Sequence, residues 1–410
     1  MSSDRPTLNV PSGAEWKPGF DQASATDAWI ATVPASDRAK SDAYFEGGYW
    51  IEFGGTVIAV LVAWLLLASR ASARWRDWSE AKFRRPFAAT LLYAAGFMLA
   101  WALLMLPWDF YTGYIREHRF GMSNHDLAGF LGDWGKELGV SLVLGSLAIA
   151  GIYAVVRRVG RRWVAWATGV TAAFLVVMIV ISPVFIRPLF NDYHPLAAGP
   201  LRDRILALAA ENRIPAKDVY WFDASRQTKR VSANVSGLFG TMRISLNDNL
   251  LNGASEPEIA AVMAHEMGHY VLDHGLKHVL SFTLVIGFGF WIVDRSFGAI
   301  RRRYGVRWGV RGLNDTAGLP LALAILTVVL YVLTPVTNSI IRVAENDADA
   351  FGLEAAREPQ GFAAVAMRIS NYRKIAPSTL EEMVFFDHPS GRTRVERSMR
   401  WLATHPPKAP

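Results

Sequence analysis

The pattern His265-Glu266-Met267-Gly268-His269 combines two imidazoles and a carboxylate at a spacing that can do hydrolytic chemistry. Residues four apart share one face of a helix, so His265 and His269 can bind the same metal ion. Glu266 follows the first ligand directly and can take a proton from a water on that metal while the water attacks a substrate. This spacing predicts the core of a zinc peptidase.

The residues before the pattern predict that it lies on a helix. Residues 255–258, Ser-Glu-Pro-Glu, form a capping box with proline in the first turn, and apolar residues follow over 259–263. In the alternative, both histidines are hydrogen-bonded polar residues of a packed helix. The glutamate between two histidines at this spacing favours the metal site.

Two histidines leave a zinc site short of one protein ligand, because a catalytic site keeps its fourth position open. The chain has no cysteine, so the ligand must be His, Asp or Glu. Glu345 and Asp349 share a helix face within the acidic run 342–349. A run of charge is usually a solvated face, but the incomplete His pair favours Glu345 as third ligand and Asp349 as the acceptor that fixes a ligand imidazole. Two like charges at this spacing also call for a cation nearby.

His274 lies five residues beyond His269. On a continuous helix it would be rotated away from the pair, so a structural role is expected for it.

The elements that position these residues belong to a membrane protein. Hydrophobic residues make up 51% of the chain and gather in long blocks. We predict a mainly α, multi-pass membrane protein with a zincin-type α+β catalytic unit and a short edge-strand sheet. The six predicted transmembrane helices cover 47–69, 86–108, 139–157, 163–186, 278–297 and 318–340.

Polar segments separate and flank these spans. Segments 187–277 and 341–410 hold 91 and 70 residues and are expected to pack into one catalytic unit. The predicted parts are a polar N-terminal segment 1–46, a four-helix membrane region 47–186, the first catalytic part 187–277 with the zinc helix, two transmembrane helices 278–340, and the second catalytic part 341–410 with the third ligand. Short strands are predicted over 218–222, 229–239 and 241–246, the last two joined through Gly240.

Charge and the N-terminus fit a membrane location. Residues 1–46 lack the features of a cleaved secretory signal, so we expect the first span to be retained. The net charge is +7, and arginines cluster beside the spans, as at 157–162 and 301–303, where lipid headgroups suit them better than nucleic acid.

The two motifs together resemble a known family. The H-E-x-x-H at 265–269 followed by R-x-x-E-x-x-A-D at 342–349 is similar to the membrane zinc metallopeptidases that include the type I CAAX prenyl endopeptidases and the HtpX-like quality-control proteases. Three stretches resemble the prenyl-endopeptidase branch, and with them the resemblance covers most of residues 90–400: 106–111 with the E-x-x-F-G-M of 117–122, 230–240, and 387–389 with 396–397.

The resemblance implies roles for individual residues. It implies one Zn²⁺ held by His265, His269 and Glu345, with Glu266 catalytic. It also implies that Asn234 pairs with the peptide backbone, and that His388 and Arg397 stabilise the tetrahedral intermediate or order the site. Without the family, His388 would be taken as a turn residue before Pro389.

The chain departs from the family in two ways. Residues 391–393 look inserted between His388 and Arg397, which puts the role of Arg397 in doubt. The eukaryotic prenyl endopeptidases have seven spans around a large chamber, against the six predicted here, so a smaller or more open chamber is expected.

We therefore expect an integral-membrane zinc metalloendopeptidase that cleaves membrane-associated polypeptides, either prenylated CAAX-type or damaged ones. Its partners would be a peptide or protein substrate and the lipid bilayer, not nucleic acid, and composition suggests a bacterial plasma membrane. The alternative is a non-catalytic membrane scaffold or transporter with a structural metal site. Transport sites usually place ionisable residues within the spans, whereas these lie just outside them.

Two indicators of sidedness disagree. Loops 70–85, 157–162 and 295–311 carry 6, 4 and 6 Lys/Arg, and loop 109–138 carries 3. The positive-inside rule then places the catalytic unit outside the cytoplasm, whereas the family resemblance places it in the cytosol. The sequence leaves the substrate and the oligomeric state open.

Overall fold

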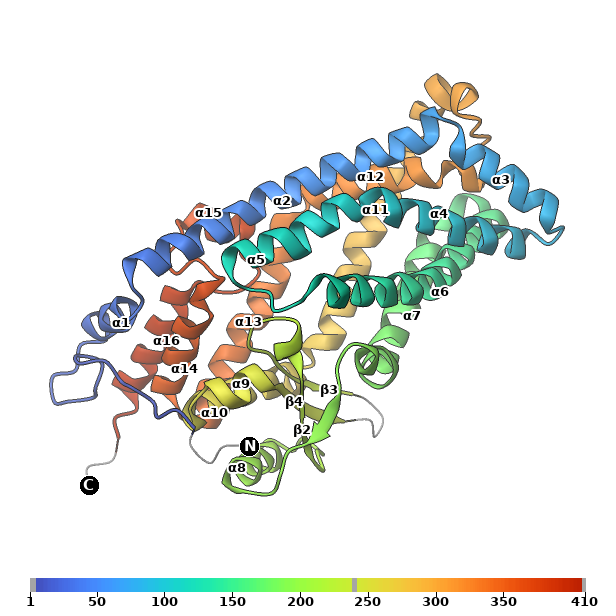
Figure 1. Ribbon diagram of the computed structural model, residues 1–410. Coiled ribbons are helices and arrows are strands. Elements are labelled where there is room, and N and C mark those ends of the chain that lie inside the picture. Colours follow the sequence, from blue (N-terminus) through green and yellow to red (C-terminus); the bar gives the residue numbers. More distant parts are fainter. Residues whose placement is uncertain (1–4, 238–241, 408–410) are drawn as a thin grey trace.

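Long helices dominate the computed structural model, which describes residues 5–237 and 242–407. Figure 1 shows these helices running from a unit with a small sheet towards α3 (Ala71–Lys82) at the far end. The other helices are α1 (Gln22–Ala31), α2 (Ala35–Ala68), α4 (Pro86–Phe110), α5 (Arg116–Phe120), α6 (Leu127–Val159), α7 (Trp163–Ile181), α8 (Pro200–Glu211), α9 (Asp248–Gly253), α10 (Glu256–Val271), α11 (His274–Trp308), α12 (Leu319–Val332), α13 (Thr334–Ala356), α14 (Pro359–Arg368), α15 (Thr379–Phe385) and α16 (Gly391–Thr404).

Several of these helices can cross a membrane. Among the described residues, four helical segments are long and apolar enough: Ala35–Ala68, Pro86–Phe120, Leu127–Leu189 and His274–Trp308. A fifth is possible if Thr316–Val332 and Thr334–Ala356, which are bent by 56°, form one broken span. The structure thus shows a multi-pass membrane protein.

The predicted count of six spans is not confirmed. Predicted spans 139–157 and 163–186 both fall in the helical segment Leu127–Leu189, which is 63 residues long. A single crossing needs only about 20 residues. This segment contains a 3₁₀ turn at Gly160–Arg162, and α6 and α7 pack against each other. The prediction of six spans takes this segment as two crossings. Taken as one crossing it leaves five spans, or four if the bent pair Thr316–Val332 and Thr334–Ala356 is not a span.

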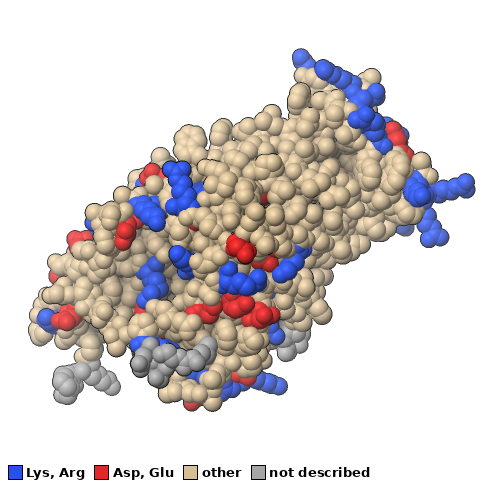
Figure 2. All heavy atoms as spheres, in the orientation of Figure 1, with Lys and Arg blue, Asp and Glu red and all other residues tan. Residues whose placement is uncertain are grey.

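Charge is distributed along the long axis of the molecule. In Figure 2, Lys and Arg gather at the end that carries α3, a broad tan stretch lies next to it, and both blue and red side chains mark the rest of this face. The loops at the basic end are tied together, because Arg311 donates to Asp77 and Glu80 at 2.9 Å each and Arg157 donates to the carbonyl of Asn314 at 3.2 Å. The three basic loops counted in the sequence therefore meet at one end.

A four-stranded sheet lies at the opposite end. Its order is β1 (Tyr193–Pro195), β2 (Val219–Phe222), β4 (Arg243–Asn247) and β3 (Ala233–Ser236). Strands β2 and β4 are parallel, and β3 pairs antiparallel with β4, Asn234 lying opposite Ser245. Strand β3 is therefore an edge strand with one side unpaired within the sheet.

The predicted strands appear in shortened form, and β1 was not predicted. The prediction that 229–239 is one strand is wrong at its start, where the N–H of Lys229 donates to the carbonyl of Met122 at 3.1 Å. The side chain of Asn247 also binds the carbonyl of Arg230 at 2.8 Å. These bonds hold 229–232 outside the sheet. The predicted junction through Gly240 lies outside the described residues.

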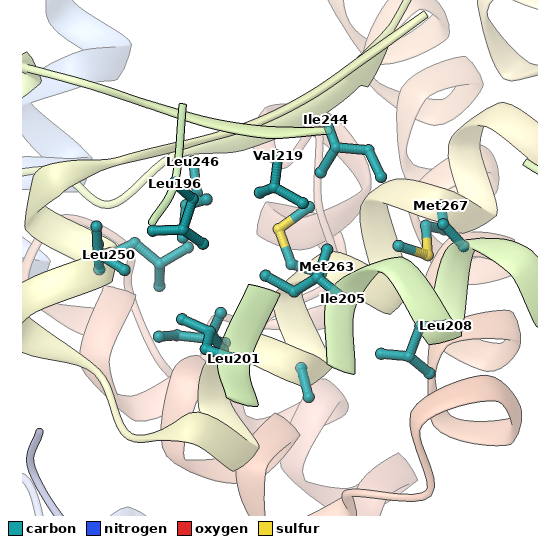
Figure 3. Packing of buried hydrophobic residues seen from close by; sticks show 14 of the residues in the cluster. Leu196, Leu201, Ile205, Leu208, Val219, Ile244, Leu246, Leu250, Met263 and Met267 are labelled. Carbon is teal, nitrogen blue, oxygen red and sulfur yellow. The ribbon is translucent and has the colours of Figure 1, made fainter. Parts of the chain in front are cut away.

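The sheet rests on two helices through an apolar core. Figure 3 shows Val219, Ile244 and Leu246 of the strands facing Ile205 of α8 and Met263 of α10. All five are less than 2% exposed. Burying side chains of this size stabilises a fold by roughly 1.5–3 kcal/mol each. This core fixes α10, which carries the H-E-x-x-H pattern, beneath the sheet.

Candidate metal centre

Three potential ligands converge between α10 and α13. The Nε2 atoms of His265 and His269 are 3.1 Å apart. Glu345 places Oε2 3.2 Å from Nε2 of His265 and Oε1 3.3 Å from Nε2 of His269. The predicted set of His265, His269 and Glu345 is therefore brought together, although Glu345 is 76 residues beyond His269 in the sequence.

Glycines allow the two helices to approach this closely. A Cβ at Gly268 of α10 would lie 3.1 Å from the Cα of Ala348, and a Cβ at Gly352 of α13 would lie 2.9 Å from the backbone nitrogen of His265. Both distances are shorter than ordinary van der Waals contact. The glycines thus set the separation of the helices that carry the ligands.

The spacing of the three side chains fits a zinc ion. One ligand atom from each of His265, His269 and Glu345 lies within 4.8 Å of the others. Each imidazole Nε2 lies 3.2 or 3.3 Å from one oxygen of the Glu345 carboxylate, close to the roughly 3.3–3.4 Å between ligand atoms of tetrahedral zinc. Oε2 of Glu345 is buried and has no aligned hydrogen-bond donor among the described residues. A cation at the centre would satisfy this oxygen and both imidazole lone pairs.

Glu266 lies beside the three ligands. With His265, Glu345 and His388 it lines a cleft of about 210 Å³. Burial raises the pKa of Glu266, although the neighbouring histidines oppose the shift. A carboxylate with a raised pKa is a better proton acceptor, as a general base requires.

Asp349 lies beside His265, and two arginines contact Asp349. Oδ1 of Asp349 lies 2.9 Å from Nδ1 of His265, so a proton on Nδ1 would leave Nε2 free to bind metal. Nε of Arg394 donates to Asp349 at 2.9 Å. Arg397 is less direct, since its Nη1 donates to the carbonyl of Asn346 at 3.1 Å and reaches Asp349 only at 3.4 Å.

Arg394 is a site residue that the sequence reasoning missed. The prediction named Arg397, which reaches Asp349 at 3.4 Å, but α16 brings Arg394 closer to the same carboxylate. The need for a cation beside Glu345 and Asp349 was a usable signal for it. The structure identifies which arginine supplies that charge most directly.

His388 lies next to Glu345, one of the three ligands, and belongs to the loop before α16. Its Nε2 is 3.3 Å from Oε2 of Glu345, and its Nδ1 is 2.8 Å from Asp387. The contact with Asp387 orients the ring so that Nε2 faces the cleft. The position suits a group that binds an oxygen of the reacting peptide.

His274 also contacts the site, contrary to the expectation from the sequence. Its Nδ1 lies 3.0 Å from Nδ1 of His269, and the side chain is buried. The expectation assumed one continuous helix. Instead α10 ends at Val271, and Asp273 has φ +55°, so the chain turns before α11 begins at His274. The turn brings the imidazole back to His269.

The edge strand enters the cleft slightly before the predicted residue. Val231, Ser232 and Ala233 line the cleft, and Asn234 is not among its lining residues. The side-chain oxygen of Asn234 accepts a hydrogen bond from Ser236 at 2.9 Å. The backbone of 231–233 is thus the part of this segment that lies nearest the reacting groups.

Comparisons with known proteins agree with this geometry. Residues 195–409 match the model of peptidase family M48, and residues 24–192 match a model described as CAAX prenyl protease N-terminal, five membrane helices. An uncharacterized metalloprotease of Bacillus subtilis, YhfN, is 29% identical over 365 residues, 88% of this chain and 85% of that protein.

Eukaryotic proteins match as well. A rice CAAX prenyl protease 1 homolog is 29% identical over 304 residues, 73% of this chain and 71% of its own. The crystal structure of S. mikatae Ste24p superposes with a TM-score of 0.75 at 21% identity, covering 90% of this chain and 89% of that one. This likeness shows a shared fold.

Proposed function

The chain belongs to peptidase family M48 and is a membrane metallopeptidase, and we propose that His265, His269 and Glu345 hold one zinc ion at which peptide bonds are hydrolysed. The observation that carries the proposal is the set of distances of 3.1, 3.2 and 3.3 Å among His265, His269 and Glu345, beside the half-buried Glu266. A scaffold or transporter with a structural metal would not need Glu266 in the same cleft.

The chain's own residues account for the steps of hydrolysis. Zinc bound at this site would polarise the scissile carbonyl and lower the pKa of water. Glu266 accepts the proton of the attacking water and passes it to the departing amine. When the imidazole of His388 is protonated on both nitrogens, with Nδ1–H donating to Asp387, Nε2 donates to the oxygen that becomes negative. Asp349, held by Arg394, keeps the ring of His265 in place.

A substrate peptide would bind by adding to the sheet. Strand β3 is an edge strand, and residues 231–233 border the cleft. An extended peptide can hydrogen-bond to such an edge through its main chain. We assign the backbone of 231–236, with Asn234, to this role.

We propose membrane-associated polypeptides, prenylated CAAX-type or damaged, as the substrate class. The similarity to eukaryotic proteins named as CAAX prenyl proteases supports prenylated substrates. A cavity of about 840 Å³ between α4 and α6 is lined mainly by aromatic and aliphatic side chains, together with Asp109, Asp133 and Glu137, and its apolar part could receive an apolar group. We also propose a bacterial plasma membrane, which the match to the Bacillus subtilis protein supports.

Metal-dependent cleavage by the purified protein tests the function. Protein in detergent should cleave casein or a prenylated-peptide reporter, lose activity with a chelator and regain it with zinc. Glu266→Gln should keep its zinc and lose at least ~100-fold in turnover. Unchanged activity after complete metal removal, or in Glu266→Gln, would rule out the proposed chemistry.

A further inference from the structure

Glu117 is a buried carboxylate at the end of a membrane helix, and the proposed steps of hydrolysis do not use it. It lies in α5, the last part of the candidate span Pro86–Phe120, and is 8% exposed. Its Oε1 accepts a hydrogen bond from the hydroxyl of Tyr44 in α2 at 2.7 Å, and its Oε2 accepts one from Nη2 of Arg230 at 2.7 Å. Arg230 also donates to the hydroxyl of Tyr44. Two helices of the membrane region thus hold one arginine of the catalytic unit.

Arg230 directly precedes the segment that lines the catalytic cleft. Residues 231–233 border this cleft together with Glu266. The carbonyl of Arg230 accepts hydrogen bonds from the side-chain amides of Asn247 at 2.8 Å and Asn249 at 3.0 Å. The backbone of Arg230 is therefore fixed by the catalytic unit, and its side chain is fixed by the membrane helices.

Backbone contacts join the same two parts of the chain without using the ion pair. Residues 122–124 lie antiparallel to 227–229, and the N–H of Lys229 donates to the carbonyl of Met122 at 3.1 Å. These contacts do not involve the side chains of the pair. Substitutions in the pair should therefore shift the segment after Arg230 without releasing it from the rest of the protein.

Stability alone does not explain a buried ion pair at this place. Taking charges out of water costs free energy, and replacing such a pair with apolar side chains of similar size is often neutral or stabilising. The pair does fix geometry, because bonds between a guanidinium and a carboxylate favour a defined distance and direction. A peptide that adds to an edge strand needs the donors and acceptors of that strand at fixed positions.

We propose that the Glu117–Arg230 pair, closed by the hydroxyl of Tyr44, positions residues 231–233 to bind the main chain of the substrate. This inference rests on the proposed peptidase function. Glu117 and Arg230 are positioning residues, because neither is among the residues that line the cleft. The metal ligands lie on α10 and α13, so a shift of residues 231–233 weakens peptide binding and leaves the chemical step intact.

Kinetics of single variants test the proposal. Arg230→Met and Glu117→Leu should each retain zinc and raise KM for a peptide reporter by about tenfold, the effect of losing a hydrogen bond between charged groups. Their kcat should stay within about twofold of wild type, as expected when only binding is weakened. Arg230→Lys keeps a cation and should recover part of the KM. In the Glu266→Gln background, Arg230→Met should raise the Kd of the same peptide by a similar factor, which measures binding without turnover.

A double variant separates positioning from stability. Glu117→Leu combined with Arg230→Met replaces both charges with apolar side chains, so its Tm should be closer to that of wild type than the Tm of either single variant. Its KM should nevertheless stay raised. Arg202→Met is the matched control, because Arg202 pairs with Asp218 at 3.0 Å beside the same sheet and away from the cleft, and its KM should equal that of wild type.

Three results would overturn the proposal: an unchanged KM in both single variants, a loss confined to kcat, or a double variant whose KM recovers together with its Tm. Failure of wild type to cleave any reporter would refute the peptidase function itself. The Kd measured in the Glu266→Gln background tests the positioning role independently of that function.

Discussion

Gly352 of α13 lies directly against the backbone of His265 in α10. A Cβ at this glycine would lie 2.9 Å from the His265 nitrogen and 2.6 Å from the Phe362 ring. The position of His265 on α10 relative to α13 therefore depends on residue 352 having no side chain.

Gly352→Ala should weaken zinc binding and lower the melting temperature. The added methyl group must push α13 away from α10, and overpacking of this kind costs roughly 1–3 kcal/mol. Thermal unfolding and zinc retention against a competing chelator would measure both effects. Gly48→Ala is the matched control, since a Cβ there meets nothing within 4 Å. Equal zinc affinity in the two variants would argue against this role for Gly352.

His274→Phe should reduce zinc affinity by about 10–100-fold. With Nε2 of His269 facing the metal, its Nδ1–H needs an acceptor, and Nδ1 of His274 lies 3.0 Å away. His274→Gln supplies an amide oxygen and should recover part of the affinity. His278→Phe is the control, because Nε2 of His278 has no hydrogen-bond partner among the described residues. Equal loss in all three variants would indicate a packing role only.

Arg394→Met should destabilise the protein more than Arg397→Met. Removing Arg394 leaves the buried carboxylate of Asp349 without its closest cation, and breaking a buried pair costs roughly 3–5 kcal/mol. Arg397 is 3.4 Å from Asp349 and bonds mainly to Asn346. Denaturant titrations of both variants would rank them. A larger loss for Arg397→Met would show that Arg397 carries the greater charge role.

The rate should fall in acid at a pH set by Glu266. Burial raises the pKa of Glu266 above its ordinary value of 4.5. Because a general base must be ionised, kcat/KM should be full above this raised pKa and decline as the pH falls through it. Profiles measured with zinc content checked at each pH would separate proton uptake by Glu266 from loss of metal. A rate independent of pH down to 4.5 would contradict the assignment.

Local signals in the sequence led to His265, His269 and Glu345, which the structure brings together. The capping box at Ser255 and Glu258 correctly placed the motif on α10, and the need for a third ligand led to Glu345. Both inferences use rules that act within one or two helical turns, together with the ligand number of zinc.

Features that depend on tertiary structure were harder to predict. His274 was misjudged because no local rule showed that the helix breaks at Asp273. Arg394 was missed because the orientation of α16 relative to α13 is set by packing between distant segments. The predicted span count differs for a similar reason, since hydropathy marks two apolar blocks over 139–186, whereas the structure joins them in the one helical segment Leu127–Leu189.

The most direct test measures zinc in three purified proteins. Wild type and Glu266→Gln should each hold one zinc ion per chain, with turnover at least ~100-fold lower in Glu266→Gln. Glu345→Gln should lose most of its zinc while its far-UV circular dichroism remains helical. Full zinc occupancy in Glu345→Gln would contradict a metal centre shared by α10 and α13.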